Sequence, residues 1–141
     1  MQAKPLHYTD EQIIALFNEH GINSTSQRVT IIRTLFDSGV HMSAEDVFQV
    51  VNAEAQQVSK ATVYNTLGLL AERGVIREVI VDPKRVFYDP NIEPHHHFYD
   101  ITTGELCDIA PDQIQVTGLP PLPEGKAIED IDVIVRLREA K

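Results

Sequence analysis

The chain has 141 residues, with 12 Lys and Arg against 21 Asp and Glu, and its formal net charge is −9. Its single cysteine excludes disulfides within the chain and a structural four-cysteine zinc site. No apolar run approaches the roughly 20 residues of a membrane-spanning helix, and the start of the chain lacks the apolar stretch of a signal peptide. We therefore expect a cytoplasmic protein with no membrane partner.

The negative charge is spread unevenly along the chain. Residues 1–92 carry 8 basic and 11 acidic side chains, whereas residues 93–141 carry 4 and 10. The first two-thirds is thus nearly balanced. An acidic total does not exclude binding to nucleic acid when the cations of such a region gather on one face.

Four helices are expected first, followed by a hairpin. Capping residues and glycines place the helices at Thr9 to Gly21, Ser26 to Asp37, from Ser43 onward, and Ser59 to Gly74. Apolar residues at helical spacing face the core, with Val47, Val50 and Val51 forming the stripe of the third helix. The runs 75–81 and 86–89 are rich in β-formers and predict a hairpin whose turn carries Lys84 and Arg85. This order predicts a winged helix-turn-helix, in which the fourth helix enters the major groove of DNA.

A smaller second domain is expected after a hinge at residues 91–94. It has predicted strands at 97–101 and 105–109, a short helical piece at 111–116, a segment rich in Gly and Pro at 118–125, and a last strand at 131–137. So few elements bury little apolar surface alone, which indicates a lobe that dimerises. The predicted fold class is α+β: an N-terminal winged helix-turn-helix DNA-binding domain (1–90) plus a small C-terminal α/β dimerisation domain (95–141).

Polar residues on the fourth helix and cations around it are the candidate DNA contacts. An Asn side chain can form two hydrogen bonds with adenine, while a Tyr side chain can form a hydrogen bond to phosphate and an apolar contact with a thymine methyl group. The candidate DNA-binding residues are Arg28, Lys60, Thr62, Tyr64, Asn65, Lys84 and Arg85, with Arg33, Arg73 and Arg77 as further phosphate contacts. Each charge taken singly also fits the solvated face of a helical core.

Three consecutive histidines are the candidate metal ligands. On a strand, His95 and His97 share one face and His96 points away. Asp89 precedes the hinge, Asp108 lies on the neighbouring predicted strand, and His41 lies before the third helix. Imidazoles and carboxylates without thiolate suit Mn2+ or Fe2+, with Zn2+ as a competitor. A histidine run on a surface loop is the alternative. Cys107 is expected to be an inert, buried thiol.

Several of these motifs, in this order, resemble the ferric uptake regulator family over residues 10–138. They are Ser43-Ala44-Glu45-Asp46, Ala61-Thr62-Val63-Tyr64 followed by Leu67, and the His-rich segment before Gly104. The triple histidine, the 118–125 linker and the ending Val133-Ile134-Val135-Arg136 resemble its iron response regulators, which respond to haem. The resemblance implies a regulatory metal site across the hinge, formed by His41, Asp89, His95, His97 and Asp108. It also implies haem as an effector bound within His95, His96 and His97.

The leading hypothesis from sequence is therefore a homodimeric transcriptional regulator of iron and haem homeostasis. As the resemblance implies, it would bind AT-rich inverted repeats in double-stranded DNA and be released by haem; a higher oligomer and a haem-delivering protein are further partners that the resemblance allows. Alternatives are an Fe2+- or Mn2+-dependent peroxide-sensing repressor, and a metal-binding protein without DNA function. An enzyme is not expected, because nothing supplies a paired acid and base in a closed pocket.

Overall fold

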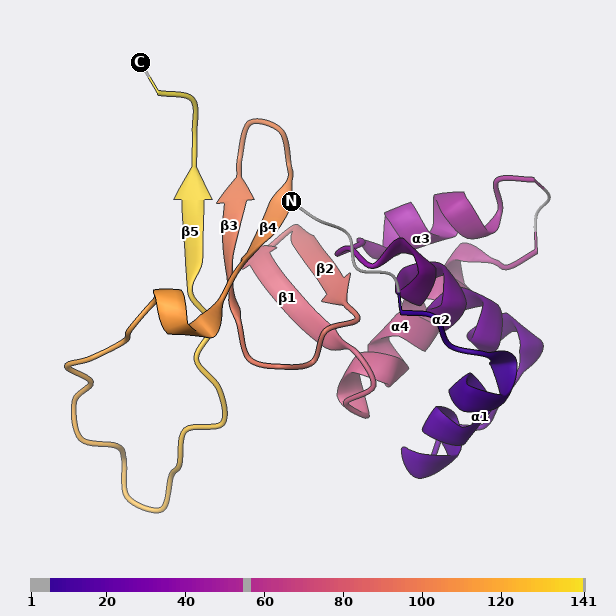
Figure 1. The fold of residues 1–141 in the computed structure, drawn as a ribbon, viewed down its shortest axis with the longest axis horizontal. Coiled ribbons are helices and arrows are strands. Elements are labelled where there is room, and N and C mark those ends of the chain that lie inside the picture. The colour runs from indigo at the N-terminus through magenta and orange to yellow at the C-terminus, as the bar shows by residue number, and fades with distance from the viewer. Residues whose placement is uncertain (1–5, 55–56, 141) are drawn as a thin grey trace. The chain divides into compact units, whose positions relative to one another are not determined.

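The computed structural model describes residues 6–54 and 57–140, and the chain forms two compact units that divide between Ile92 and Glu93. Within the described residues, the first unit holds four helices and a hairpin (Figure 1): α1 (Asp10–Glu19), α2 (Ser26–Ser38), α3 (Ala44–Val51), α4 (Lys60–Glu72), β1 (Arg77–Asp82) and β2 (Arg85–Asp89). None of the described helices has the length and apolar character that crossing a membrane requires.

Side-chain caps begin the helices where the sequence predicts them. Thr9 and Ser43 each form a capping box at the start of α1 and α3. At the start of α4, Oγ of Ser59 accepts a hydrogen bond from the backbone N–H of Thr62 at 3.1 Å. Each cap satisfies an N–H group that has no partner within its own helix, so the three helix starts are set locally.

The helices and the hairpin enclose one apolar core in the first unit. Its fully buried side chains include Ile13, Phe17, Ile31, Ile32, Leu35, Val47, Val63, Leu67 and Leu70. The prediction that Val50 belongs to the core stripe of α3 is wrong, because its side chain is 56% exposed. Val50 lies about 100° around the helix from Val51, beyond the edge of the buried face.

A single β-bridge ties the hairpin to the link before α3. Met42 and Tyr88 pair in antiparallel fashion, each donating its N–H to the other's carbonyl, at 3.1 Å and 2.7 Å. The bridge lies between the end of β2 and the residues that precede Ser43. It therefore holds the start of α3 against the hairpin.

The second unit is a three-stranded sheet with one short turn of 3-10 helix. Its elements are β3 (His96–Asp100), β4 (Leu106–Ile109), η1 (Pro111–Gln113) and β5 (Ile134–Leu137), in the sheet order β4-β3-β5. β3 pairs with β4 in antiparallel fashion and with β5 in parallel fashion. Residues 114–133 form no helix or strand and run as an open loop before β5 (Figure 1).

Two elements of the second unit are three residues shorter than the sequence predicts. The helical piece expected at 111–116 ends at Gln113, because Ile114 is already extended at φ −125 and ψ 130. The last strand begins at Ile134 rather than at Ile131. Just before it, the N–H of Val133 donates to a histidine side chain at 3.0 Å instead of to a neighbouring strand.

Candidate metal centre and DNA-binding face

The first unit brings one imidazole and one carboxylate together by strand pairing. The bridge between Met42 and Tyr88 sets the residues beside them, His41 and Asp89, opposite each other. Nε2 of His41 lies 3.0 Å from Oδ2 of Asp89, and both side chains are 4% exposed. The other oxygen of Asp89, Oδ1, accepts a hydrogen bond from the N–H of Asn91 at 2.9 Å. This N-terminal donor pair (His41 and Asp89) thus has its carboxylate fixed by the backbone.

The second unit brings two imidazoles and one carboxylate together by register. His97 on β3 pairs directly with Asp108 on β4, so both side chains lie on one face of the sheet. Nε2 of His95 and Nε2 of His97 lie 3.3 Å and 3.5 Å from Oδ1 of Asp108, and the two rings are 4.5 Å apart. We call His95, His97 and Asp108 the C-terminal donor cluster; the predicted sharing of one face by the two histidines is what the structure shows.

A backbone hydrogen bond prepares His95 to act as a ligand. Its Nδ1 lies 2.6 Å from the carbonyl oxygen of Glu93. A carbonyl oxygen only accepts, so Nδ1 carries a proton and donates it. In the neutral ring, Nε2 then holds a lone pair that faces Asp108, which is the state in which an imidazole binds a metal ion.

His96 is held in the opposite tautomer. The N–H of Val133 donates to Nδ1 of His96 at 3.0 Å, so this nitrogen supplies the lone pair. The neutral ring must then carry its proton on Nε2, which leaves no second lone pair for a metal ion or a haem iron. This hydrogen bond argues against His96 as a ligand within the proposed haem triplet.

A further carboxylate, which sequence analysis missed, lies beside the C-terminal donor cluster. Oδ1 of Asp132 is 3.5 Å from Nδ1 of His97. Asp132 belongs to the segment that precedes β5, far from His97 in sequence. No spacing rule signals this proximity, because it depends on the parallel pairing of β3 with β5.

The donor atoms suit a hard or borderline divalent ion. Both groups supply imidazole nitrogen and carboxylate oxygen, a combination that fits Fe2+ or Mn2+ and admits Zn2+.

Cys107 is half-buried rather than buried, which corrects the sequence prediction, and its thiol donates to Oε1 of Glu105 at 3.6 Å. Burial, together with the nearby Glu105 carboxylate, raises the pKa of Cys107. A protonated thiol is a poor ligand and a poor nucleophile.

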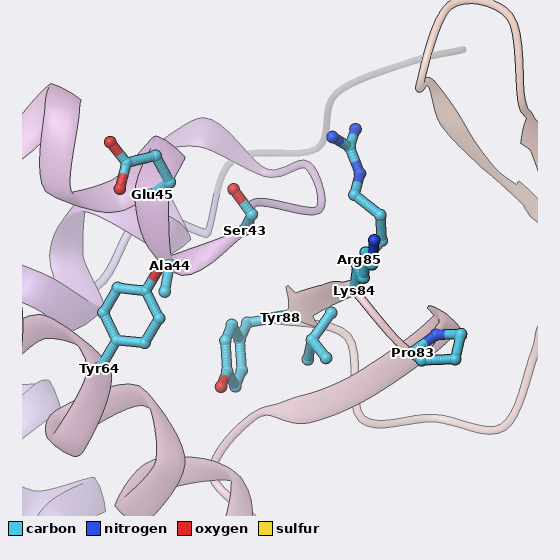
Figure 2. Close-up of a pocket in the computed structure, with 9 residues that line it drawn as sticks. Ser43, Ala44, Glu45, Tyr64, Pro83, Lys84, Arg85 and Tyr88 are labelled. Atoms are coloured by element: carbon cyan, nitrogen blue, oxygen red, sulfur yellow. The ribbon is translucent and has the colours of Figure 1, made fainter.

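The first unit also has a cavity beside the predicted recognition helix. Its volume is about 390 Å³. Figure 2 shows Tyr64 of α4 beside the start of α3, with the basic tip of the hairpin across the cavity. The lining residues are Ser43, Ala44, Glu45, Tyr64, Pro83, Lys84, Arg85, Val86 and Tyr88. Tyr64 is 46% exposed, and Asn65 beside it is exposed as well.

The predicted phosphate-binding cations differ in how they are held. Nζ of Lys60 lies 2.9 Å from Oε2 of Glu45, and this hydrogen bond raises the pKa of the lysine. Nη1 of Arg28 donates to the carbonyl of Asn23 at 3.0 Å. At the hairpin tip Lys84 and Arg85 are both exposed, and Thr62, in the first turn of α4, is half-buried.

Two arginines predicted to contact phosphate instead bind the helical scaffold. Arg33 forms an ion pair with Asp10 and donates to the carbonyl of Tyr8 at 2.9 Å. Nη1 of Arg73 donates to the carbonyls of His20 and Gly21, at 3.2 Å and 3.0 Å. Both guanidinium groups hold neighbouring segments of this unit together, and their contact with phosphate remains a prediction.

Comparison with known proteins identifies the family. The model of the ferric uptake regulator family matches residues 19–133. The chain belongs to this family. It is similar to the peroxide-responsive repressor PerR of Staphylococcus aureus strain Mu50, with 27% identity over 108 residues that cover 77% of this chain and 73% of the repressor. The sequence motifs resemble those of the iron response regulators, whereas the similarity over 108 residues is to a peroxide-responsive repressor.

Solved structures confirm the predicted α+β fold. The ferric uptake regulator of Pseudomonas aeruginosa with manganese aligns at a TM-score of 0.70 and 23% identity, over 90% of this chain and 97% of its own. That of Vibrio cholerae aligns at a TM-score of 0.70 and 16% identity, over 89% and 98%. The fold thus joins an N-terminal helical DNA-binding domain to a C-terminal α/β dimerisation domain. Together with the family match, this makes the protein a metal-responsive, DNA-binding transcriptional regulator and not an enzyme.

Proposed function

We propose that the N-terminal donor pair and the C-terminal donor cluster bind one Fe2+ or Mn2+ ion together, and that this binding controls affinity for DNA. The observation that carries the proposal is the preparation of each group for a metal ion. A backbone N–H holds Asp89 beside His41, and a backbone carbonyl turns the Nε2 lone pair of His95 toward Asp108. Neither group alone offers a full coordination sphere, and each supplies the same types of donor atom.

The bound ion would supply a link between the two domains. Its effect on DNA follows from thermodynamics, since a ligand shifts an equilibrium only by its different affinity for the two states. A dimer with its domains held at one angle presents its two recognition helices at one spacing. We propose that metal binding favours the spacing that fits an AT-rich inverted repeat.

Side chains of the first unit would then read the DNA. Tyr64 and Asn65 stand exposed on α4, where they can contact base edges, and Lys84 and Arg85 stand exposed at the hairpin tip, where they can contact phosphates. Lys60 can exchange its carboxylate partner for a phosphate on binding. We therefore expect Tyr64 and Asn65 to contact bases, and Lys60, Lys84 and Arg85 to contact phosphates.

We propose hydrogen peroxide as the signal that releases DNA. The similarity to a peroxide-responsive repressor supports this choice, as does the raised pKa of Cys107, which disfavours a thiol as the sensor. Bound Fe2+ would supply the redox chemistry that Mn2+ does not. The O–O bond of peroxide would break, one oxygen atom would insert into a C–H bond of the His41 or His95 ring, and the other oxygen atom would leave as water. An oxidised ring is a weaker ligand, so the link between the domains would be lost.

Mass spectrometry tests this signal directly. Peroxide treatment of the Fe2+-loaded protein is expected to add the mass of one oxygen atom to the peptide that contains His41 or His95 and to abolish DNA binding. The Mn2+-loaded protein is the control and should gain no such mass. Loss of DNA binding without an adduct, or an adduct only on Cys107, would overturn the peroxide proposal.

The second candidate signal is haem, and this hypothesis rests on the resemblance to iron response regulators. Selection of fragmented genomic DNA separates the candidates when metal-free, Mn2+-loaded and haem-treated samples of the protein run in parallel. Enrichment of a palindromic AT-rich site that haem abolishes would establish the haem response. Enrichment that needs metal and ignores haem would exclude it. No enrichment in any sample would favour a metal-binding protein without DNA function.

A further inference from the structure

We propose that Asp132 is the positioning residue for His97 in the metal centre. In this proposal the carboxylate accepts a hydrogen bond from Nδ1–H of His97 and thereby keeps Nε2 as the ligand nitrogen. The inference rests on the proposed function, because it assigns an outer partner to one of the proposed ligands. It adds a residue from the segment just before β5 to a centre whose other residues lie on β4 or earlier in the chain.

Two carboxylates flank the ring of His97. Oδ1 of Asp108 lies 3.5 Å from Nε2, and Oδ1 of Asp132 lies 3.5 Å from Nδ1. The ring itself is fully buried, so its surroundings rather than water decide which nitrogen carries the proton. Nε2 of His97 and the carboxylate of Asp108 are proposed to bind the same ion. Nε2 must therefore hold a lone pair rather than a proton. The proton then belongs on Nδ1, where Asp132 can accept it.

Nδ1 has a different partner in each of the two ligand histidines, His95 just before β3 and His97 on β3. Nδ1 of His95 donates to the carbonyl of Glu93, which is neutral. Nδ1 of His97 faces the carboxylate of Asp132, which is charged. A carboxylate partner makes the imidazole a stronger ligand than a carbonyl does, because it stabilises the positive charge that the ring acquires on binding a metal ion. His97 is thereby set apart as the stronger of the two nitrogen donors.

The backbone around Val133 fixes Asp132 in this place. The N–H of His97 donates to the carbonyl of Val133 at 3.1 Å, and the N–H of Val133 donates to Nδ1 of His96 at 3.0 Å. The N–H and the carbonyl of Val133 are therefore both hydrogen-bonded to residues of β3. These bonds restrict the position of Asp132, the residue before Val133. The Asp132 side chain is 28% exposed, so the surrounding protein shields most of it from water.

Nuclear magnetic resonance of the metal-free protein tests the contact itself. A long-range 1H–15N correlation spectrum of the neutral ring reports which nitrogen of His97 carries the proton. We expect the proton on Nδ1 in the wild type and in Asp132→Asn, whose amide oxygen still accepts a hydrogen bond. Asp132→Ala should move it partly or wholly to Nε2. An unchanged His97 pattern in Asp132→Ala would overturn the inference, whatever the metal affinity.

Metal affinity, measured by competition with a chromophoric chelator for Zn2+ and Co2+, tests the consequence. Asp132→Ala is expected to weaken binding about 10- to 100-fold, and Asp132→Asn less. Glu129→Ala is the matched control, since it removes an exposed carboxylate nearby and should leave affinity unchanged. Circular dichroism and thermal melting of the metal-free variants establish that they fold.

His97→Ala separates failure of the inference from failure of the proposed function. If this variant binds metal as tightly as the wild type, or if the wild type binds none, the proposed metal centre is wrong, and the resonance experiment alone decides the Asp132 contact. If His97→Ala loses affinity while Asp132→Ala retains it, the centre stands and the positioning role of Asp132 is refuted.

Discussion

The cations at the hairpin tip make a quantitative prediction about salt. Lys84 and Arg85 are exposed on the turn between β1 and β2. A dimer on its operator has two such tips, and therefore four cations that can reach phosphates. Each phosphate contact contributes about 0.9 to the slope of log affinity against log salt. Replacing both residues by Gln should make the slope shallower by about 3.6. Between about 50 and about 200 mM salt, the variant should lose about 100-fold less affinity than the wild type does.

Fluorescence anisotropy with a labelled operator and saturating Mn2+ measures both slopes. The double variant Lys126→Gln/Arg138→Gln is the matched control, because it removes the same charge from exposed positions of the second unit. Its slope should equal that of the wild type. Equal slopes for the wild type and the hairpin variant would refute the placement of the hairpin on the DNA backbone. Equal slopes for the two double variants, both shallower than the wild type, would show that net charge alone sets the effect.

Four further changes probe the helix, the metal centre, the core and the thiol. Asn65→Ala should cost about 1–3 kcal/mol of discrimination at one base pair, measured by competition between operator variants, and should leave metal content unchanged. His97→Ala should remove metal from the purified protein and keep the helical circular dichroism of the first unit; unfolding of that unit would make the ring structural. Ile32→Ala, at a fully buried site, should lower the free energy of unfolding in urea by about 2–5 kcal/mol, and a loss below about 1 kcal/mol would contradict its place in the core. Burial raises the pKa of Cys107, so alkylation should be slower than that of free cysteine at neutral pH and accelerate only as the pH passes that raised value. Cys107→Ser should leave the peroxide response intact, and a lost response would make the thiol the sensor.

Features that depend on neighbours in sequence could be predicted from the residues alone. The caps at Thr9, Ser43 and Ser59 join groups only three residues apart, so their chemistry is visible in the sequence. The exposure of Val50 was not predictable in this way. A helix can carry a wider apolar stripe than its neighbours cover, and the covered width depends on how α2 and α4 pack against α3.

The candidate metal ligands also differ in whether the local sequence or the tertiary structure brings them together. That His95 and His97 share a face follows from the period of a strand. The pairing of His41 with Asp89 depends on a single bridge between segments far apart in sequence, so residue patterns alone do not predict it. The sequence offers both residues as candidate ligands, and the family resemblance alone suggests that they belong to one site. Neither the residue pattern nor the family resemblance predicts Asp132, because its position depends on the register of β5, which pairs with β3 after a long irregular loop.

The parallel pairing of β3 with β5 has a consequence for the order in which the protein matures. β3 and β4 join through a short turn, whereas β5 must first close the loop of residues 114–133, which costs chain entropy and time. All five proposed ligands leave the ribosome before β5 does. A nascent chain would thus hold its donors while the ring of His97 can still adopt either tautomer. The full strength of His97 as a ligand would then be acquired with β5, after the ligands themselves have been synthesised.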